Sequence, residues 1–523
     1  MGQRVAQRSV QISGYLALSS LVLITAWAFY GLGSVAEGRL SWSVFTDAYI
    51  HRILLFSLKQ AALSATLAVL LALPVARALY YLPDLAGKRA FLALCLLCFV
   101  LPTLILITGL VALLGGSGWL TPYLGESWNL YGLQGILLAH CFLNLPFAIR
   151  AFYLQLQALP ASAWLLARQL KLNTWQQCSL LEWPQLRGRL LTVWVFIFVL
   201  CFNSFAVVLS LGGGPQATTL EVAIYQALKY DFNIPEALSL AWLQLLIAGS
   251  FYLLITRFGS SGWLSADTAK AQFLPKPKPV QAVLHQMSYY LAWVMLIAPL
   301  LALMPSLLQI NAERLSKLSL LKPLLTSLGL GLIAACLAVL LALLVLNPIR
   351  KARKQHQLRK QWLLEGLANH HLVMPAMVLS VGLYVWSLKH LDLETWGLFF
   401  VILVNALILV PFATQQLKPR LFQFDDQYQR LAQQLKLNTW AYWRVLLPWL
   451  ARDLQAAFVL CLLLAIGDVA IFSIFASDDW MSVPWLIYSY AGSYRLVEAS
   501  VLSFLLLLIC AALVLWLERI KNH

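Results

Sequence analysis

Twelve long apolar stretches divide this chain of 523 residues, and they constrain its fold more than any other feature. An α-helix needs about 20 residues to cross the roughly 30 Å hydrocarbon core of a bilayer, and each stretch is about that long. Because backbone groups inside hydrocarbon must be satisfied internally, runs of this length predict helices. The stretches lie near residues 13–33, 53–76, 90–114, 133–153, 190–211, 237–257, 286–308, 324–346, 362–387, 397–416, 454–475 and 497–517.

The composition supports an integral membrane protein. Hydrophobic residues make up 61% of the chain and charged residues 11%, whereas soluble domains carry about 25% charged residues. Arg4 and Arg8 precede the first apolar stretch as in a signal peptide, but no small-residue cleavage site follows, so we expect an uncleaved first helix. The eight cysteines lie in or beside apolar stretches and indicate no disulfide framework. The predicted fold is an all-α membrane protein.

The positive charge of the chain follows the predicted topology. A net charge of +16 would suggest nucleic acid as the partner of a soluble protein. Here, most of the 37 Lys and Arg residues fall in segments that face the cytoplasm if the N-terminus is inside. We therefore expect a multi-pass protein of the bacterial inner membrane, surrounded by lipid, with both termini cytoplasmic and no nucleic-acid partner.

An internal repeat divides the chain into two halves. Residues 166–175 and 431–440 are identical at nine of ten positions and lie 265 residues apart (431 − 166 = 265). This period is too long for a solenoid unit. Each half carries six apolar stretches, so both insert in the same direction, related by a pseudo-two-fold axis along the membrane normal. We predict transmembrane halves at 1–264 and 280–523, joined by a Pro-rich cytoplasmic linker at 265–279.

Each repeat lies in a polar loop between the fourth and fifth apolar stretches of its half. The loops, near 160–184 and 425–448, predict a helix, an Asn-Thr interruption and a second helix. In the first copy, Asn173 or Thr174 can cap the second helix, with a glutamine three residues later as its capping-box partner. The sequence therefore predicts a helix-turn-helix in the cytoplasm.

This layout resembles the EAA loop of ATP-binding-cassette importer permeases. In that family Glu-Ala-Ala is followed by three residues and a Gly, and then by a hydrophobic residue and Pro. Ala167 and Ala432 match the second Ala of the pattern, and Pro184 and Pro448 match its closing Pro. The resemblance implies a type I importer permease with two fused halves.

The chain departs from the family pattern at the turn of the loop. Lys171 and Lys436 stand where the family has Gly. A left-handed conformation costs a non-glycine residue about 1–2 kcal/mol. We therefore expect the turn either to be right-handed or to move to Asn173 and Asn438, since Asn tolerates the left-handed region better.

The resemblance implies that each loop couples to one of two copies of an ABC ATPase subunit, which carries ATP and Mg. The Gly-rich stretch 209–216 lacks the Gly-Lys-Ser/Thr of a phosphate loop, so we expect no cofactor on this chain and no enzymatic activity of its own. An interfacial amphipathic helix is the alternative for each loop, but lipid contact does not require near-identity in both halves. The implied coupling residues are Leu166, Ala167, Leu170, Lys171, Asn173, Trp175, Pro184, Leu431, Ala432, Leu435, Lys436, Asn438, Trp440 and Pro448.

Three further segments resemble permeases of bacterial thiamine transporters. They are residues 131–140, residues 210–228 with their Gly-Gly-Gly-Pro, and residues 466–468. This resemblance covers essentially the whole chain and implies transport of thiamine, and possibly of its phosphates, delivered by a periplasmic thiamine-binding protein. A ferric iron importer permease is the alternative, because iron permeases share the fused layout. A secondary transporter with two six-helix halves is a more remote alternative.

Each half has a structured segment before its last apolar stretch. In the first half, Thr218 and Glu221 are typical of a capping box that opens a short helix. In the second half, residues 482–490 occupy the corresponding place. Such a helix can rest at the lipid headgroups, form a periplasmic gate or dock a delivery protein. The candidate gate or docking residues are Gly212, Gly213, Gly214, Tyr225, Trp485 and Tyr488.

Polar residues inside the apolar stretches are candidates for the translocation path. Asp468 is the acidic residue placed deepest, and a carboxylate among aromatic residues suits the permanent cation of thiamine. Alternatively, its carboxylate caps a helix break. Asn203 and Ser204 lie at the same depth in the first half, and Phe205 aligns with Asp468. His140 and Asn144 are further polar residues that more often tie helices together.

Two adjacent histidines require a separate interpretation. His370 and His371 adjoin the predicted cytoplasmic end of the 362–387 stretch. The sequence around them contains no zinc-ligand spacing. We expect them to lie at the membrane interface and not to bind a metal.

Overall fold

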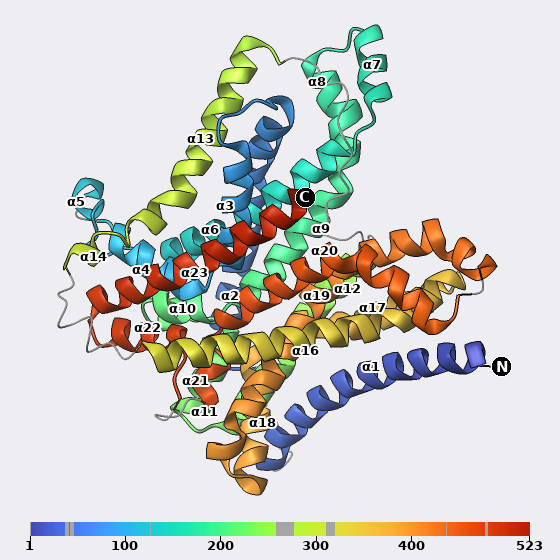
Figure 1. The fold of residues 1–523 in the computed structure, drawn as a ribbon. Helices are drawn as coiled ribbons and strands as arrows, with labels where there is room; N and C mark the ends of the chain where they lie inside the picture. Colours follow the sequence, from blue (N-terminus) through green and yellow to red (C-terminus); the bar gives the residue numbers. More distant parts are fainter. Residues whose placement is uncertain are drawn as a thin grey trace.

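The computed structural model describes residues 2–36, 41, 46–125, 127–257, 277–309, 320–435, 437–475 and 480–522. Helices joined by short turns account for nearly all of them (Figure 1). They are α1 (Gly2–Val35), α2 (Ala48–Tyr81), α3 (Lys88–Val100), α4 (Thr103–Leu114), α5 (Thr121–Leu124), α6 (Leu133–Gln157), α7 (Ala161–Gln169), α8 (Thr174–Gln177), η2 (Cys178–Glu182), α9 (Trp183–Phe202), α10 (Ala206–Leu211), η3 (Pro215–Ala217), α11 (Leu220–Lys229), α12 (Ile234–Arg257), α13 (Pro279–Leu301), α14 (Ser306–Gln309), α16 (Leu321–Lys354), α17 (Leu358–Asn369), η4 (His370–Leu372), α18 (Ala376–His390), α19 (Leu393–Gln434), α20 (Thr439–Ile466), α21 (Phe472–Phe475), α22 (Val483–Gly492) and α23 (Leu496–Asn522).

The helices confirm the predicted class of fold. Among the described residues, ten helices are long and apolar enough to cross a membrane, and two bent helix pairs bring the number to twelve if each pair is one span. The predicted linker 265–279 is described only from residue 277 onward, so its other residues lie outside the described part of the chain.

Two of the predicted spans, 90–114 and 362–387, are broken into two helices each. α3 and α4 meet at an angle of 105°, and the pair containing α17 and α18 is bent by 78°. Each second arm begins directly after a proline, Pro102 or Pro375. A proline disfavours helical geometry in the preceding residue and lacks the N–H that continues a helix, so both breaks have a local cause.

The fifth span of each half is also interrupted. α9 ends at Phe202 and α10 begins at Ala206, within the predicted stretch 190–211. In the second half, α20 ends at Ile466, and α21 begins at Phe472. Gly467 lies so close to Pro102 that an added Cβ would be 3.0 Å from the Pro102 Cα. This break of the second half therefore contacts the bent span of the first half.

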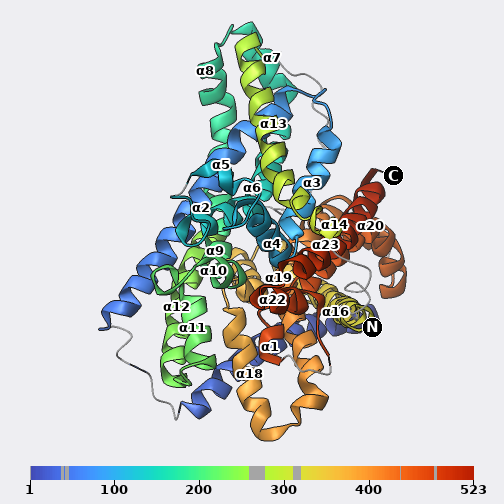
Figure 2. The ribbon, with the colours of Figure 1, turned by 90° about the vertical axis from the view of Figure 1, so that its left-hand side faces the viewer.

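The first helix of each half packs on the other half. α1 contacts α16 and α18, and α13 contacts α2, α3 and α4. Figures 1 and 2 show α1 beside the helices of the second half and α13 beside those of the first. This exchange joins the two halves over a large surface, and the main hydrophobic core includes helices of both.

Matching hydrogen bonds reveal the relation between the halves. The Leu220 N–H, at the start of α11, donates to the Ser57 hydroxyl of α2 over 3.0 Å. The Val483 N–H, at the start of α22, donates to the Ser327 hydroxyl of α16 over 2.8 Å. Each short helix is therefore held by the second long helix of its own half, as pseudo-two-fold symmetry requires.

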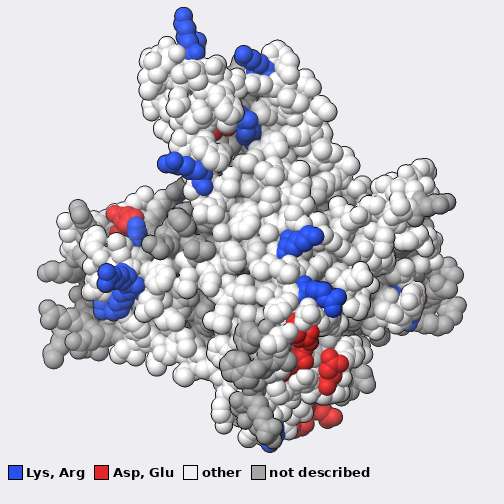
Figure 3. Space-filling model, turned by 180° about the vertical axis from the view of Figure 1, so that it is seen from behind, with Lys and Arg blue, Asp and Glu red and all other residues white. Residues whose placement is uncertain are grey.

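Charge is unevenly distributed over the surface. On the face seen in Figure 3, Lys and Arg side chains lie mainly toward the top and left, and most Asp and Glu side chains form one group near the bottom. The hairpin of α7 and α8 lies at the top of Figure 1, and α11 and α18 lie toward its bottom. The basic end of this face therefore includes the level of the first polar loop.

Candidate functional site: a cavity between the halves and two polar loops

A cavity of about 320 Å³ lies between the two halves and is lined by both. The breaks in the fifth spans contribute all four residues predicted for the path. Glu221, predicted as part of a helix cap, and Asn405, for which no role was predicted, also line this cavity. The polar and aromatic residues of its wall are Phe99, Thr103, His140, Asn144, Asn203, Ser204, Phe205, Glu221, Asn405, Phe412 and Asp468.

Glu221 joins the two halves beside this cavity. Its carboxylate accepts hydrogen bonds from Gln244 Nε2 over 2.6 Å and from the Met377 N–H over 3.2 Å. Met377 lies in the first turn of α18, so the negative charge faces the positive end of that helix. Gln244 also donates to Asn203 Oδ1, and Asn203 Nδ2 donates to the Leu372 carbonyl. The predicted capping box is wrong, because Thr219 is the N-cap of α11 and Glu221 bonds elsewhere.

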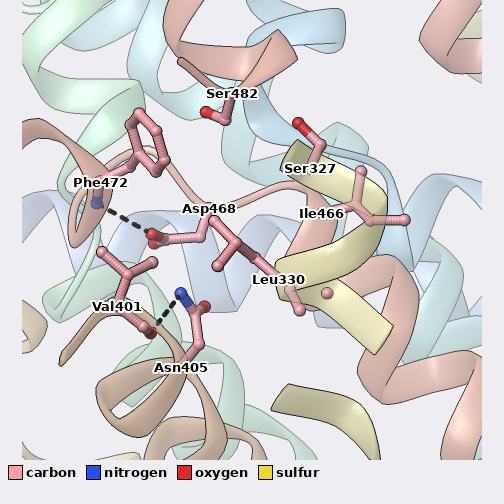
Figure 4. Close-up of a pocket in the computed structure, with 10 residues that line it drawn as sticks. Ser327, Leu330, Val401, Asn405, Ile466, Asp468, Phe472 and Ser482 are labelled. Atoms are coloured by element: carbon pink, nitrogen blue, oxygen red, sulfur yellow. Dashed lines mark hydrogen bonds between the residues drawn. The ribbon is translucent and has the colours of Figure 1, made fainter. Parts of the chain in front are cut away.

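Asp468 lies at the break after α20, as expected if its carboxylate caps a helix break. Its Oδ2 accepts from the Ile471 N–H at 3.2 Å. It also accepts from the Phe472 N–H at 3.3 Å, the bond drawn in Figure 4. The side chain is half-buried and lines both the main cavity and a smaller pocket shared with Asn405 and Ser482. The carboxylate therefore stabilises a helix break and also contributes to the wall of the cavity.

The short helices α11 and α22 occupy equivalent places in the two halves. α11 packs against α18 of the second half, and α22 packs against α4 of the first. Tyr225 is buried and makes an edge contact with Phe205, with 5.1 Å between ring centroids. Trp485 stacks on Tyr488, with 5.6 Å between ring centroids. Both short helices therefore pack on the opposite half.

The glycine run before α11 makes a tight turn. Gly213 and Gly214 have φ values of 71° and 137°, in the region that favours glycine. Gly212 follows α10 directly and donates its N–H to the Val208 carbonyl. The Gly132 N–H donates to the Leu211 carbonyl over 2.7 Å, so this turn is fixed against the start of α6.

The first polar loop turns at Lys171, contrary to our expectation. Lys171 has a φ of 50°, so it takes the left-handed conformation itself. The Leu172 N–H donates to the Ala167 carbonyl and the Lys171 N–H to the Arg168 carbonyl, which is the Schellman pattern. These bonds satisfy carbonyls at the end of α7 and compensate for the cost of a left-handed lysine.

Asn173 then starts the second helix of this loop, as predicted. Its Oδ1 accepts from the Gln176 N–H at 2.8 Å, and Gln176 Oε1 accepts from the Asn173 N–H at 2.9 Å. Asn173 is extended, with φ −71°, so it caps the helix and does not make the left-handed turn. Pro184 stands in the first turn of α9, where a missing N–H is tolerated.

Buried contacts fix the first loop to the C-terminal end of α2. Trp164 is 1% exposed, and its Nε1 donates to the Tyr80 hydroxyl over 2.8 Å. Glu182, also 1% exposed, pairs with Arg77 at 2.8 Å and accepts from the Tyr81 hydroxyl at 2.5 Å. A force applied to the loop therefore acts directly on α2.

The second loop has the same hydrogen bonds at its turn. The Leu437 N–H donates to the Ala432 carbonyl, and Asn438 Oδ1 accepts from the Ala441 N–H over 2.7 Å. Lys436, which completes the predicted turn, lies outside the described residues. Pro448 falls inside α20.

A different ion pair fixes the second loop to α16. Arg350 pairs with Asp425, with 2.5 Å between Nη2 and Oδ1 and 2.8 Å between Nε and Oδ2. Arg350 also donates to the Tyr442 hydroxyl over 2.6 Å. The two halves therefore fix their loops to equivalent helices by different residues, which the repeat did not reveal.

The loops present apolar side chains to solvent, but not at every predicted position. Ala167 is 2% exposed, so it supports the loop and cannot form much of an outer surface. The exposed apolar side chains at matching positions are Leu166, Leu170 and Trp175 in the first loop and Leu431, Leu435 and Trp440 in the second.

The two histidines belong to the η4 turn between the two arms of the bent helix pair. Nε2 of His370 is 2.9 Å, and Nε2 of His371 3.2 Å, from the Thr25 hydroxyl of α1. They therefore link the first helix of one half to the break of the other.

Replacing Lys171 with Gly should make the first loop more resistant to proteolysis. Glycine removes the left-handed cost of about 1–2 kcal/mol, and its greater freedom in the unfolded chain offsets about 0.5–1 kcal/mol of this gain. Lys171→Val should have the opposite effect, because a branched Cβ fits the left-handed region poorly. Cleavage rates within residues 160–184 by proteinase K measure this. Faster cleavage of the glycine variant than of the parent would contradict the assigned turn.

Comparison with known proteins identifies relatives along nearly the whole chain. The chain is 35% identical over 522 residues to the thiamine transport system permease protein ThiP of Haemophilus influenzae, covering 97% of this chain and 96% of the relative. It is 35% identical over 519 residues to ThiP of Escherichia coli, with 98% and 97% covered.

A more distant relative agrees with these two. The chain is 31% identical over 519 residues to ThiP of Brucella abortus, covering 97% of this chain and 95% of the relative. No protein-family model matches the sequence. Relatives this similar over this length establish the family, and the chain belongs to the thiamine transport system permeases.

Proposed function

We propose that this chain is the membrane-spanning permease of an ATP-driven importer that moves thiamine into the cytoplasm, with the thiamine phosphates as further candidate cargo. The observation that carries this proposal is the near-full-length similarity to permeases named for thiamine transport. These relatives favour thiamine over the ferric-iron alternative. The multi-pass helical fold agrees with this role.

The cavity between the halves supports an organic cation as cargo. Its volume of about 320 Å³ is at the lower end of the ~300–1,000 Å³ typical of small-molecule pockets. Thiamine carries a permanent positive charge on its thiazolium ring, and Asp468 supplies a half-buried carboxylate in the wall. Phe99, Phe205 and Phe412 add aromatic faces that attract cations.

The energy for transport is proposed to come from two copies of a separate ABC ATPase, which bind ATP and Mg. Support comes from the two loops, which repeat the same exposed apolar positions and are each fixed to a long helix by buried ion pairs. A secondary transporter has no need for two such surfaces. In this proposal the loops and both termini face the cytoplasm from the inner membrane, and a periplasmic thiamine-binding protein delivers the cargo near α11 and α22.

Growth of a thiamine auxotroph tests the substrate directly. Cells that lack their own thiamine permease should grow on trace thiamine only when this chain is expressed with its ATPase and binding protein. A parallel culture limited for iron serves as the control and should not respond. Equal growth on trace thiamine with and without the chain would contradict the proposal, and rescue of the iron-limited culture would favour the iron alternative.

Asp468→Asn should reduce thiamine uptake about 10- to 100-fold, since hydrogen bonds to charged groups contribute about 1.5–3 kcal/mol. Asn keeps an oxygen that can accept from the Ile471 and Phe472 N–H groups, so the helix break should persist while the charge is lost. Initial uptake rates at matched expression measure the effect. Full transport by the variant would leave Asp468 with its capping role alone.

A further inference from the structure

One buried polar atom in the wall of the cavity has no partner. His140 lies in α6, is 2% exposed and lines the cavity. Its Nδ1 lies 3.1 Å from the Ser64 hydroxyl of α2. Its Nε2 has no hydrogen-bond partner among the described residues, and among the residues lining this cavity it is the one buried side-chain atom in that condition.

The surrounding polar groups are already engaged. Asn144, one turn after His140, donates to the His140 carbonyl over 2.9 Å. Asn203 bonds Gln244 and Leu372, and Glu221 bonds Gln244 and Met377. Buried polar atoms in native proteins nearly always have a partner, so an unpartnered one beside a cavity points to a missing ligand.

We propose that His140 Nε2 binds the cargo directly, and that the permease itself contains a binding site for an organic cation with a neutral heteroaromatic ring. This inference rests on the proposed function for the identity of the cargo. Thiamine consists of a cationic thiazolium and a neutral aminopyrimidine. The aminopyrimidine presents an amino donor beside a ring-nitrogen acceptor, so it can pair with either tautomer of the imidazole.

The charge of each ring determines which residue binds it. Asp468, from the second half, supplies the carboxylate for the thiazolium, and His140, from the first half, binds the pyrimidine. A hydrogen-bonding site discriminates strongly against an analogue that lacks the matching group, because the site is then left with an unpaired buried atom. His140 therefore determines which heteroaromatic ring is accepted.

The competing interpretation is that His140 only ties α6 to α2 through Ser64. In that case, replacing His140 would loosen the packing and weaken the binding of all cargo molecules equally. Discrimination between two cargoes that differ only in the pyrimidine ring separates the two interpretations, since a structural tie does not affect it.

The test measures equilibrium binding of radiolabelled thiamine to the permease–ATPase complex in nanodiscs, with the binding protein omitted. Competition is measured with thiamine and with its benzylthiazolium analogue, in which a phenyl ring without hydrogen-bonding groups replaces the aminopyrimidine. The parent complex should prefer thiamine by about fivefold or more, as one hydrogen bond predicts. His140→Ala and His140→Gln should lose this preference. Asp468→Asn should weaken both ligands and retain the preference, and His51→Ala, an exposed histidine of α2, should change neither.

Two results would overturn the inference. One is the absence of saturable thiamine binding by the parent complex, and the other is an unchanged preference in the assembled His140 variants. Thiamine uptake by the complete importer is measured in parallel. If the complete importer takes up thiamine but the parent complex does not bind it, or the His140 variants keep the preference, only the role of His140 is refuted. If the complete importer does not take up thiamine, the proposed function is refuted.

Discussion

Replacing Leu170 and Leu435 together with Asp should abolish copurification of the ATPase subunit with the permease. These leucines occupy matching positions in the two loops and are 62% and 61% exposed. Truncation of a central apolar contact costs about 2 kcal/mol or more, so loss at both loops should weaken the complex about a thousandfold. Because both side chains face solvent in the permease alone, its own stability should change little.

The control for this prediction is Tyr494→Asp, an equally drastic change at a residue that is 91% exposed and lies between α22 and α23. This variant should retain the ATPase. Thermal unfolding of each purified permease shows that folding is unaffected. Normal recovery of the ATPase with the double variant would contradict the docking role of the loops.

Arg350→Ala should lower the free energy of unfolding by about 3–5 kcal/mol, because removing one member of a buried ion pair leaves the other as an uncompensated buried charge. The side chains of Arg350 and Asp425 are only 7% and 4% exposed, and the guanidinium binds both carboxylate oxygens. Lys354, 3.2 Å from the same carboxylate, can compensate for part of the loss, which places the expected effect toward the lower value. Denaturant unfolding followed by tryptophan fluorescence measures the change.

A neighbouring ion pair provides a matched control. Arg353 and Asp426 lie 2.9 Å apart on the same two helices, but their side chains are 34% and 61% exposed. Arg353→Ala should therefore cost less than about 1 kcal/mol. Replacing Arg350 with Met and Asp425 with Leu together should recover part of the lost stability, since both fully buried charges are then gone and Lys354, 31% exposed, can reach solvent. Equal losses for the buried and the exposed pair would contradict this account of how the second loop is held.

The sequence predicted the class of fold because hydrocarbon leaves few alternatives for apolar stretches of this length. It did not predict the bends after Leu101 and Met374, although Pro102 and Pro375 are visible in the sequence. Prolines also occur inside continuous helices of this protein, as Pro74 does in α2. Whether a proline bends a span depends on what packs against it, which one sequence does not reveal.

Path residues were easier to predict than their partners. Asn203 and Asp468 were selected because polar groups are rare in apolar stretches, and both line the cavity. Glu221 was assigned to a helix cap because Thr218 lies three residues before it. Its actual partners, Gln244 and the Met377 N–H, come from elements distant in sequence. Long-range pairing of this kind leaves no local pattern.

The turn of the first loop could not be predicted for a different reason. A propensity argument disfavours a left-handed Lys171, yet the residue has a φ of 50°. The Schellman hydrogen bonds and the buried Trp164 and Glu182 fix both sides of the turn. Their combined energy exceeds a local cost of about 1–2 kcal/mol. Tertiary contacts therefore overrode the propensity of one residue.

Uptake into proteoliposomes tests the central claim most directly. Vesicles should contain this permease with its ATPase, and the thiamine-binding protein should be added outside with radiolabelled thiamine. We predict accumulation of thiamine that requires ATP inside the vesicles and the binding protein outside, and that is absent when the permease carries the Leu170→Asp and Leu435→Asp changes. Uptake driven by an ion gradient in the absence of ATP would contradict the account and would identify the chain as a secondary transporter.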